Sequence, residues 1–120
     1  MIEGHGLERR GKSISNLMLM DPLGYLEFLN LMEHAGLVIT DSGGIQEETT
    51  FLGIPCLTLR DNTERPVTVE AGTNELCPLD PVRVVDRSRA ILQGKTKRGK
   101  VPDMWDGKTA ERIIEILAKV

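Results

Sequence analysis

Apolar residues in this 120-residue chain gather in short runs that are separated by segments with helical spacing. The runs are LMLM (17–20), LVIT (37–40) and PCLTL (55–59), and none of them alternates apolar with polar residues. Such runs are typical of strands covered on both faces, as in a parallel sheet. We therefore predict three strands there, with short strands or connections at 67–70 and 74–76.

Four further segments show the spacing or the end signals of helices. Leu26, Leu29 and Met32 recur at helical spacing in the first of them, and Gly36 and Gly53 are expected to end the first two. The predicted helices are residues 22–35, 43–52, 81–92 and 108–119. Strands and helices in this alternation predict an α/β fold with a parallel sheet and right-handed crossovers.

Composition fits one soluble domain, with 40% hydrophobic and 28% charged residues. Residues 1–15 show no periodicity and are predicted to be a poorly ordered leader, whereas 16–120 form the folded part. The sequence has no secretory signal and no apolar run long enough to cross a bilayer, so we expect a cytoplasmic protein without a membrane partner.

Charge and cysteine usage narrow the function classes further. A net charge of −3 and 3% aromatic residues argue against a nucleic-acid partner, and the basic run from Lys95 to Lys100 is typical of a solvated loop. Cys56 and Cys77 lie in apolar surroundings and share no metal-ligand spacing with the histidines. We expect both to be reduced packing residues and predict no metal site.

The stretch TDSGGIQEE (40–48) passes from strand to helix at the carboxyl edge of the predicted sheet, where open parallel sheets bind ligands. Ser42, Gly43 and Gly44 would occupy this turn, where backbone N–H groups and the helix dipole favour an anion. Glu48 lies one helical turn further on, and its carboxylate suits a ribose diol. The stretch predicts a nucleoside diphosphate site, although a plain N-cap with first-turn acids remains an alternative.

A charged loop, LRDNTERPVTVEAGTN (59–74), follows the third predicted strand. Because this loop leaves the same edge of the sheet, we expect it beside the turn at Ser42. Arg60 and Arg65 can each offer a forked donor to phosphate oxygens, and Glu64 can orient one of them. A surface loop of ion pairs is the alternative interpretation.

Three separated motifs, TDSGGIQEE, FLGIPCLTLRDNTERPVTVEAGTN and WDGKTAERI, resemble the C-terminal half of the non-hydrolysing UDP-N-acetylglucosamine 2-epimerases over residues 17–119. The resemblance implies a two-domain GT-B fold, of which this chain is part of the three-layer, Rossmann-like, UDP-binding domain. It also implies interconversion of UDP-GlcNAc and UDP-ManNAc by elimination and re-addition of UDP, without a cofactor or obligatory metal. Family members are usually homodimers that serve cell-envelope polysaccharide synthesis.

The resemblance also assigns roles to residues that match the family motifs. Ser42, Gly43 and Gly44 would hold the diphosphate, Glu48 the ribose hydroxyls and Arg65 a phosphate. Phe28 would lie near uracil and Leu23 would offer backbone atoms to the base edge, although a lone aromatic at helical spacing is more often a core residue. Support roles are expected for Tyr25, Gln46, Thr63 and Glu64, and Asp106 of the WDGK motif is expected to cap the last helix.

We assign no catalytic acid or base to this chain. In the family the proton-handling carboxylates come from the N-terminal domain, and neither His5 nor His34 matches the family's HR-x-EN histidine motif. Pro78 stands where the family has glycine, and the first strands of a full Rossmann-like domain are missing. We therefore expect the isolated chain to be inactive and the strand at 17–20 to be an exposed sheet edge.

Two other function classes remain open at this point. One is a stand-alone nucleotide-sugar-binding or regulatory module without catalysis. The other is a fragment of a GT-B glycosyltransferase, which would also place a glutamate on the ribose. The TERP and WDGK motifs favour the epimerase over the glycosyltransferase.

Overall fold

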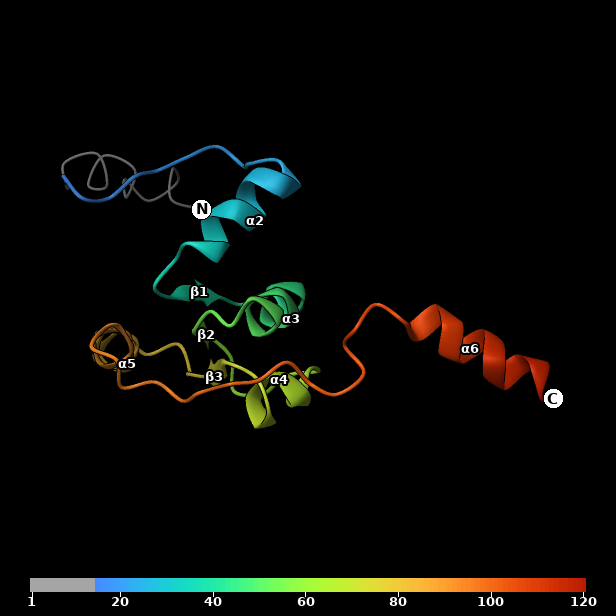
Figure 1. Cartoon of the computed structure of the whole chain (residues 1–120). Helices are drawn as coiled ribbons and strands as arrows, with labels where there is room; N and C mark the ends of the chain where they lie inside the picture. Colours follow the sequence, from blue (N-terminus) through green and yellow to red (C-terminus); the bar gives the residue numbers. More distant parts are fainter. Residues whose placement is uncertain (1–14) are drawn as a thin grey trace. The chain divides into compact units, whose positions relative to one another are not determined.

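The computed structural model describes residues 15–120 of the chain, so most of the predicted leader at 1–15 lies outside the described residues. Strands and helices alternate through the first part of it (Figure 1). The elements are α2 (Tyr25–Glu33), β1 (Val38–Thr40), α3 (Gly43–Leu52), β2 (Cys56–Thr58), α4 (Pro66–Glu70), β3 (Asn74–Leu76), α5 (Pro81–Leu92) and α6 (Thr109–Ala118). The described helices include none that is long and apolar enough to cross a membrane.

The three strands form one parallel sheet in the order β1-β2-β3, which confirms the predicted α/β architecture. Val38 pairs with Cys56 and Cys56 with Asn74, so these three residues stand in one row across the sheet. All three residues of the central strand β2 are buried. The continuous apolar run at 55–59 is explained by this position, because a central parallel strand is covered on both faces.

The two faces of the sheet are covered by different helices. Side chains alternate between faces along each strand, and Leu57 points to the face where it packs with Cys77 of the segment after β3 and Ile91 of α5. Thr58 points to the opposite face, which α3 and α4 cover. There the Thr58 hydroxyl contacts Asn74, and Asn74 in turn contacts Thr68 of α4. This part of the chain therefore has three layers, as the resemblance implied.

Local signals in the sequence set the ends of two helices where they were predicted. Helix α3 ends at Gly53, which has a left-handed backbone (φ 75°) and donates its N–H to Thr49 O and Thr50 O. This conformation costs glycine less than any residue with a Cβ atom. Helix α5 starts with Pro81 after the N-cap residue Asp80, whose side chain accepts from Val82 N at 3.1 Å.

Three predictions about the elements were wrong in part. Residues 17–20 are not a strand, and all four side chains are exposed. Their own compact unit, residues 15–30, offers no strand with which their backbone could pair. Helix α2 starts at Tyr25 instead of 22, since a glycine at position 24 disfavours an earlier turn, and Gly24 O accepts from Phe28 N at 2.9 Å.

The segment at 67–70, which was predicted to be a strand or a connection, is helix α4. Pro66 is its first residue and Thr68 N donates to Arg65 O at 3.0 Å. A proline at the first helical position outweighs the β preference of the two valines that follow.

The chain divides between Asn30 and Leu31, within α2, into two compact units, and each is described by itself. The second unit, residues 31–120, contains the sheet and the helices that cover it. Cys56 and Cys77 are both free and buried in this unit, as predicted. Burial raises the pKa of the Cys56 thiol, so it stays protonated at neutral pH.

Candidate nucleotide site

The first turn of α3 forms the centre of the candidate site. Ser42 is the N-cap residue, with an extended backbone (φ −83°, ψ 133°), and within the described structure its hydroxyl makes no capping hydrogen bond. Gly43 and Gly44 are the first two residues of the helix, so their N–H groups have no intrahelical acceptor. Neither glycine has a positive φ. Their contribution is therefore space for an approaching group, not an unusual turn.

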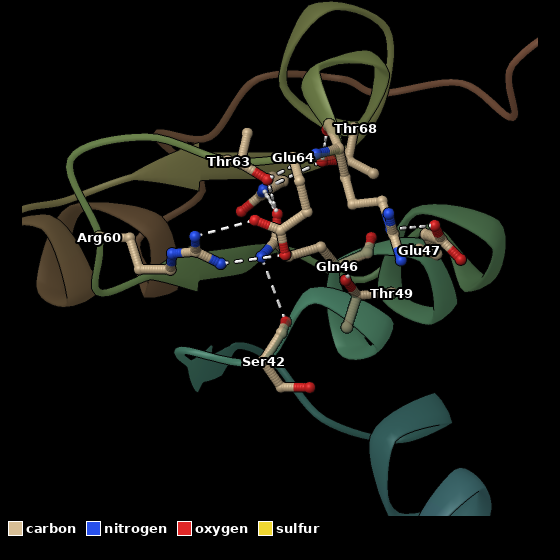
Figure 2. Close-up of polar contacts among 10 residues, drawn as sticks. Ser42, Gln46, Glu47, Thr49, Arg60, Thr63, Glu64 and Thr68 are labelled. Carbon is tan, nitrogen blue, oxygen red and sulfur yellow. Dashed lines mark hydrogen bonds and ion pairs between the residues drawn. The ribbon is translucent and has the colours of Figure 1, made fainter.

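The loop after β2 folds back onto this first turn, as the sequence predicted. A Cβ atom at Gly43 would lie 2.5 Å from Glu64 Oε1, so a larger residue would have to displace that carboxylate. The Thr63 hydroxyl donates to Gln46 Oε1 of α3 at 2.6 Å (Figure 2). The segments that follow β1 and β2 therefore meet at the carboxyl edge of the sheet.

Each arginine of this loop is paired with a glutamate. Arg60 binds Glu64 through both ends of the carboxylate, with Nη1 to Oε1 at 3.1 Å and Nη2 to Oε2 at 2.8 Å. The hydrogen bond from Arg60 holds the pKa of Glu64 below its ordinary value. Arg65 Nε forms an ion pair with Glu47 Oε1 of α3. The prediction that Glu64 orients one arginine is thus confirmed for Arg60.

A buried network of amides and hydroxyls lies beneath these ion pairs. Gln46 and Asn74 are both fully buried, and Asn74 Nδ2 donates to Gln46 Oε1 at 2.9 Å. Asn74 Nδ2 also lies 3.0 Å from Thr68 Oγ1, and Asn74 Oδ1 accepts from Thr58 Oγ1 at 2.5 Å. Helix α3, strands β2 and β3 and helix α4 are therefore tied together by hydrogen bonds on this side of the sheet.

The other predicted site residues have the following positions. Glu48 is half-buried on α3, four residues after Gly44, as expected from the sequence. Phe28 and Leu23 are half-buried in the unit formed by residues 15–30, and their contact with a base stays a prediction. Their exposure is equally compatible with packing.

The prediction for the last helix needs a correction. Its N-cap residue is Lys108, not Asp106. The Asp106 side chain accepts from Lys108 N at 3.0 Å and forms an ion pair with Arg112, which holds the pKa of Asp106 below its ordinary value. Asp106 thus supports the start of α6 from two residues earlier, because its side chain reaches forward to a backbone N–H.

Sequence reasoning missed three residues that the structure brings into the site. Glu47 entered only the alternative interpretation, as one of the first-turn acids of the helix, whereas it pairs with Arg65. Thr58 and Asn74 were not singled out, although both are polar residues within predicted strands. A polar residue at a buried strand position is a signal for a network, since it needs a partner there.

Comparison with known proteins adds the decisive observation. The sequence profile of the UDP-N-acetylglucosamine 2-epimerase family matches residues 3–118. This chain belongs to that family. A UDP-N-acetylglucosamine 2-epimerase of Methanocaldococcus jannaschii is 46% identical over 106 residues, which are 88% of this chain and 28% of the relative. A UDP-2,3-diacetamido-2,3-dideoxy-D-glucuronate 2-epimerase of Pseudomonas aeruginosa is 40% identical over 95% of this chain and 32% of the relative.

A solved structure of the M. jannaschii 2-epimerase in complex with UDP-GlcNAc and UDP aligns with 99% of this chain, at a TM-score of 0.81 and 41% identity. The alignment covers 32% of that structure. The chain therefore has the fold of one part of a 2-epimerase and spans about a third of its length. Membership of this family favours the epimerase over the glycosyltransferase interpretation of the motifs.

Among residues 15–120 the structure contains no cluster of three or more His, Cys, Asp or Glu side chains suited to a metal ion. The groups available for a ligand at the carboxyl edge are the N–H groups at the start of α3, the Ser42 hydroxyl and the two arginines with their glutamates. This set can bind an anionic, hydroxyl-bearing ligand.

Proposed function

We propose that this chain supplies the UDP-binding part of a 2-epimerase that interconverts UDP-N-acetylglucosamine and UDP-N-acetylmannosamine. One observation carries the proposal: a solved 2-epimerase structure in complex with UDP-GlcNAc and UDP aligns with 99% of this chain. The meeting of the Ser42 turn with the loop that bears Arg65 supports it further, because these are the two segments from which phosphate ligands were predicted.

In this proposal the diphosphate lies against the first turn of α3. The N–H groups of Gly43 and Gly44 and the hydroxyl of Ser42 donate to phosphate oxygens, helped by the helix dipole. Arg65 exchanges its ion pair with Glu47 for a phosphate. Its side chain is 43% exposed, so this exchange requires no opening of the core.

The remaining contacts in this proposal hold the nucleoside. Glu48, one turn along α3 from Gly44, accepts hydrogen bonds from the ribose hydroxyls. Phe28 lies against uracil and the backbone of Leu23 contacts the base edge, as the family resemblance implies.

The reaction requires removal of the proton at C2 of the sugar, departure of UDP, and return of both with the proton on the opposite face. Arg65 and the helix N-terminus stabilise the negative charge of the departing diphosphate. An acid and a base must act across the sugar ring, and we propose that both come from outside these 120 residues. The chain alone then binds UDP without epimerising its sugar, and requires no cofactor.

The family resemblance also supports the wider setting. We propose that the full protein is a cytoplasmic homodimer that contributes to cell-envelope polysaccharide synthesis. The P. aeruginosa relative favours a second candidate substrate, a UDP-linked diacetamido uronate, because its match spans 95% of this chain. Both candidates share UDP. Competition of each sugar nucleotide against UDP would rank them.

Calorimetric titration of the purified chain with UDP tests the proposal, with AMP and inorganic phosphate as controls. We expect saturable binding that prefers UDP and is strongly, but still measurably, weakened by Arg65→Ala. Glu48→Ala should weaken binding by about 1–3 kcal/mol, since charge-assisted hydrogen bonds are lost. Arg83→Ala, an exposed position on α5, is the matched control and should leave the affinity unchanged.

Absence of UDP binding by a chain shown to be folded would contradict the proposal. Unchanged affinity in Glu48→Ala would remove that residue from the site. Binding of UDP together with epimerisation by the chain alone would refute the assignment of the acid and base to other parts of the protein.

A further inference from the structure

Gln46 connects the two segments of the candidate site through a single buried side chain. Its Nε2 donates to Ser42 O at 3.2 Å, and its Oε1 accepts from Thr63 Oγ1 at 2.6 Å. Figure 2 shows the Gln46 side chain between Ser42 and Thr63. Because Ser42 O can only accept, the amide has one usable orientation, with Nε2 toward the turn and Oε1 toward the loop.

Thr63 links Gln46 to the backbone of Arg65. Its hydroxyl hydrogen goes to Gln46 Oε1, and its oxygen accepts from Arg65 N at 2.9 Å. The carbonyl of Arg65 is held as well, since Thr68 Oγ1 donates to Arg65 O at 2.7 Å. Both backbone groups of Arg65 are therefore bound by hydroxyls of the network.

Asn74 supports both of these hydroxyl contacts from beneath. Its Nδ2 donates to Gln46 Oε1 and lies 3.0 Å from Thr68 Oγ1. It is 0% exposed, so each of these groups would be costly to leave without a partner. The Arg65 backbone is thus anchored to the sheet while its guanidinium stands in solvent beside Glu47.

We infer that Gln46 and Thr63 are positioning residues, which hold the Arg65 backbone at a fixed place against the Ser42 turn so that the guanidinium reaches the diphosphate. This inference rests on the proposed UDP site. Neither residue needs to touch the ligand, because Gln46 is 0% exposed and acts through Thr63. A purely structural network would stabilise the fold equally, but its effect on UDP binding would not depend on Arg65.

A double-mutant cycle on the full chain separates these two roles. Thr63→Val keeps the shape of the side chain but removes the hydroxyl, and should weaken UDP binding about three- to tenfold in calorimetric titration. Thr63→Ser keeps the hydroxyl and should stay within about twofold of the wild-type affinity. In an Arg65→Ala background, Thr63→Val should cause no further loss for UDP or for any residual nucleotide binding. An equal loss in both backgrounds, or none in either, would overturn the inference.

Amide hydrogen exchange provides a readout that does not depend on UDP. In Thr63→Val the Arg65 amide should exchange about tenfold faster, whereas the Ile54 amide, which donates to Thr49 O at 2.9 Å, should not change. Thr63→Ser should restore protection. Wild-type protection that persists in Thr63→Val contradicts the positioning role. A folded wild-type chain that protects Arg65 but fails to bind UDP contradicts the proposed function instead.

Discussion

The two faces of strand β2 are built from different chemistry. On the α5 face Leu57 packs with Cys77 and Ile91, and Leu37 and Val84 lie against this cluster. The face toward α3 and α4 buries polar side chains instead. Those that are less than 2% exposed there are Gln46, Thr49, Thr50, Thr58, Thr68 and Asn74, with the thiol of Cys56 beside Thr58.

This difference suggests that one face mainly stabilises the sheet, whereas the other fixes the positions of individual groups. Apolar burial is favourable in proportion to area and does not depend on direction, so the α5 face can stabilise the sheet without fixing any one contact. Most buried amides and hydroxyls find a partner in a defined direction, and among those of α3 in the described structure Thr50 Oγ1 is the exception. The proposed nucleotide site stands over the polar face, where the positions of Ser42 and Arg65 are set by such bonds.

The largest effect is expected from Leu57→Ala on the apolar face. Leu57 is 0% exposed at the centre of its cluster, and the cavity left behind should lower the free energy of unfolding by about 3 kcal/mol. Urea denaturation would measure this loss. UDP affinity, determined where the variant is still folded, should not change. A loss of UDP affinity as large as the loss of stability would show that the two faces are not separate.

On the polar face, Asn74→Ala should lower the free energy of unfolding by about 2 kcal/mol, because it removes the acceptor of the buried Thr58 hydroxyl and one of the two donors to Gln46 Oε1. Unlike Leu57→Ala, it should also weaken UDP binding in the folded protein. Glu75→Gln is the matched control, since Glu75 is the next residue of β3 and faces Arg87 on the other side. Glu75→Gln should lower the free energy of unfolding by less than about 1 kcal/mol. Equal costs for Asn74→Ala and Glu75→Gln would contradict the comparison.

Much of the fold was predictable because local signals marked it. The bounds of α3 and α5 were predicted to the residue, since glycine, aspartate and proline stand at their ends. The prediction failed at 17–20 and 67–70, where a short apolar or β-branched run does not tell whether a partner strand exists. Pairing is a property of the whole sheet, so no local pattern contains it.

The sequence predicted which backbone segments meet at the site, but not which side chains pair there. That the loop bearing Arg65 meets the Ser42 turn follows from parallel topology, because both segments leave the same edge. The pairing of Arg65 with Glu47, one residue before the predicted Glu48, depends on the rotation of α3 about its axis. The contact of Asn74 with Gln46 depends on the register of β3 against β2. Neither quantity can be read from spacing along the chain.

The partly exposed side chains at the edge of the polar face, Glu47, Glu64 and Arg65, allow a test with a smaller expected effect. Glu47→Gln removes the carboxylate that competes with phosphate for Arg65, and should strengthen UDP binding about two- to fivefold. The neighbouring variant Glu48→Gln should act in the opposite direction, because there the carboxylate is proposed to bind the ribose. Calorimetric titration measures both. Weaker binding in Glu47→Gln would mean that Arg65 needs Glu47 to stay in place, and that the buried network alone does not hold it.

The smallest effect is expected from Glu64, whose side chain is 48% exposed at the same edge of the sheet. The hydrogen bond from Arg60 lowers the pKa of Glu64 from its ordinary value of 4.5. A carboxyl whose pKa is lower in the folded than in the unfolded chain stabilises the fold above its unfolded pKa, and this contribution is lost as the pH falls through the folded value. Urea denaturation of wild type and Glu64→Gln should therefore differ slightly at pH 7, and this difference should shrink as the pH falls below 4.5. A constant difference between pH 3 and pH 7 would show that the ion pair with Arg60 is not its source. Glu64 would then contribute to stability without its charge, as the residues of the apolar face do.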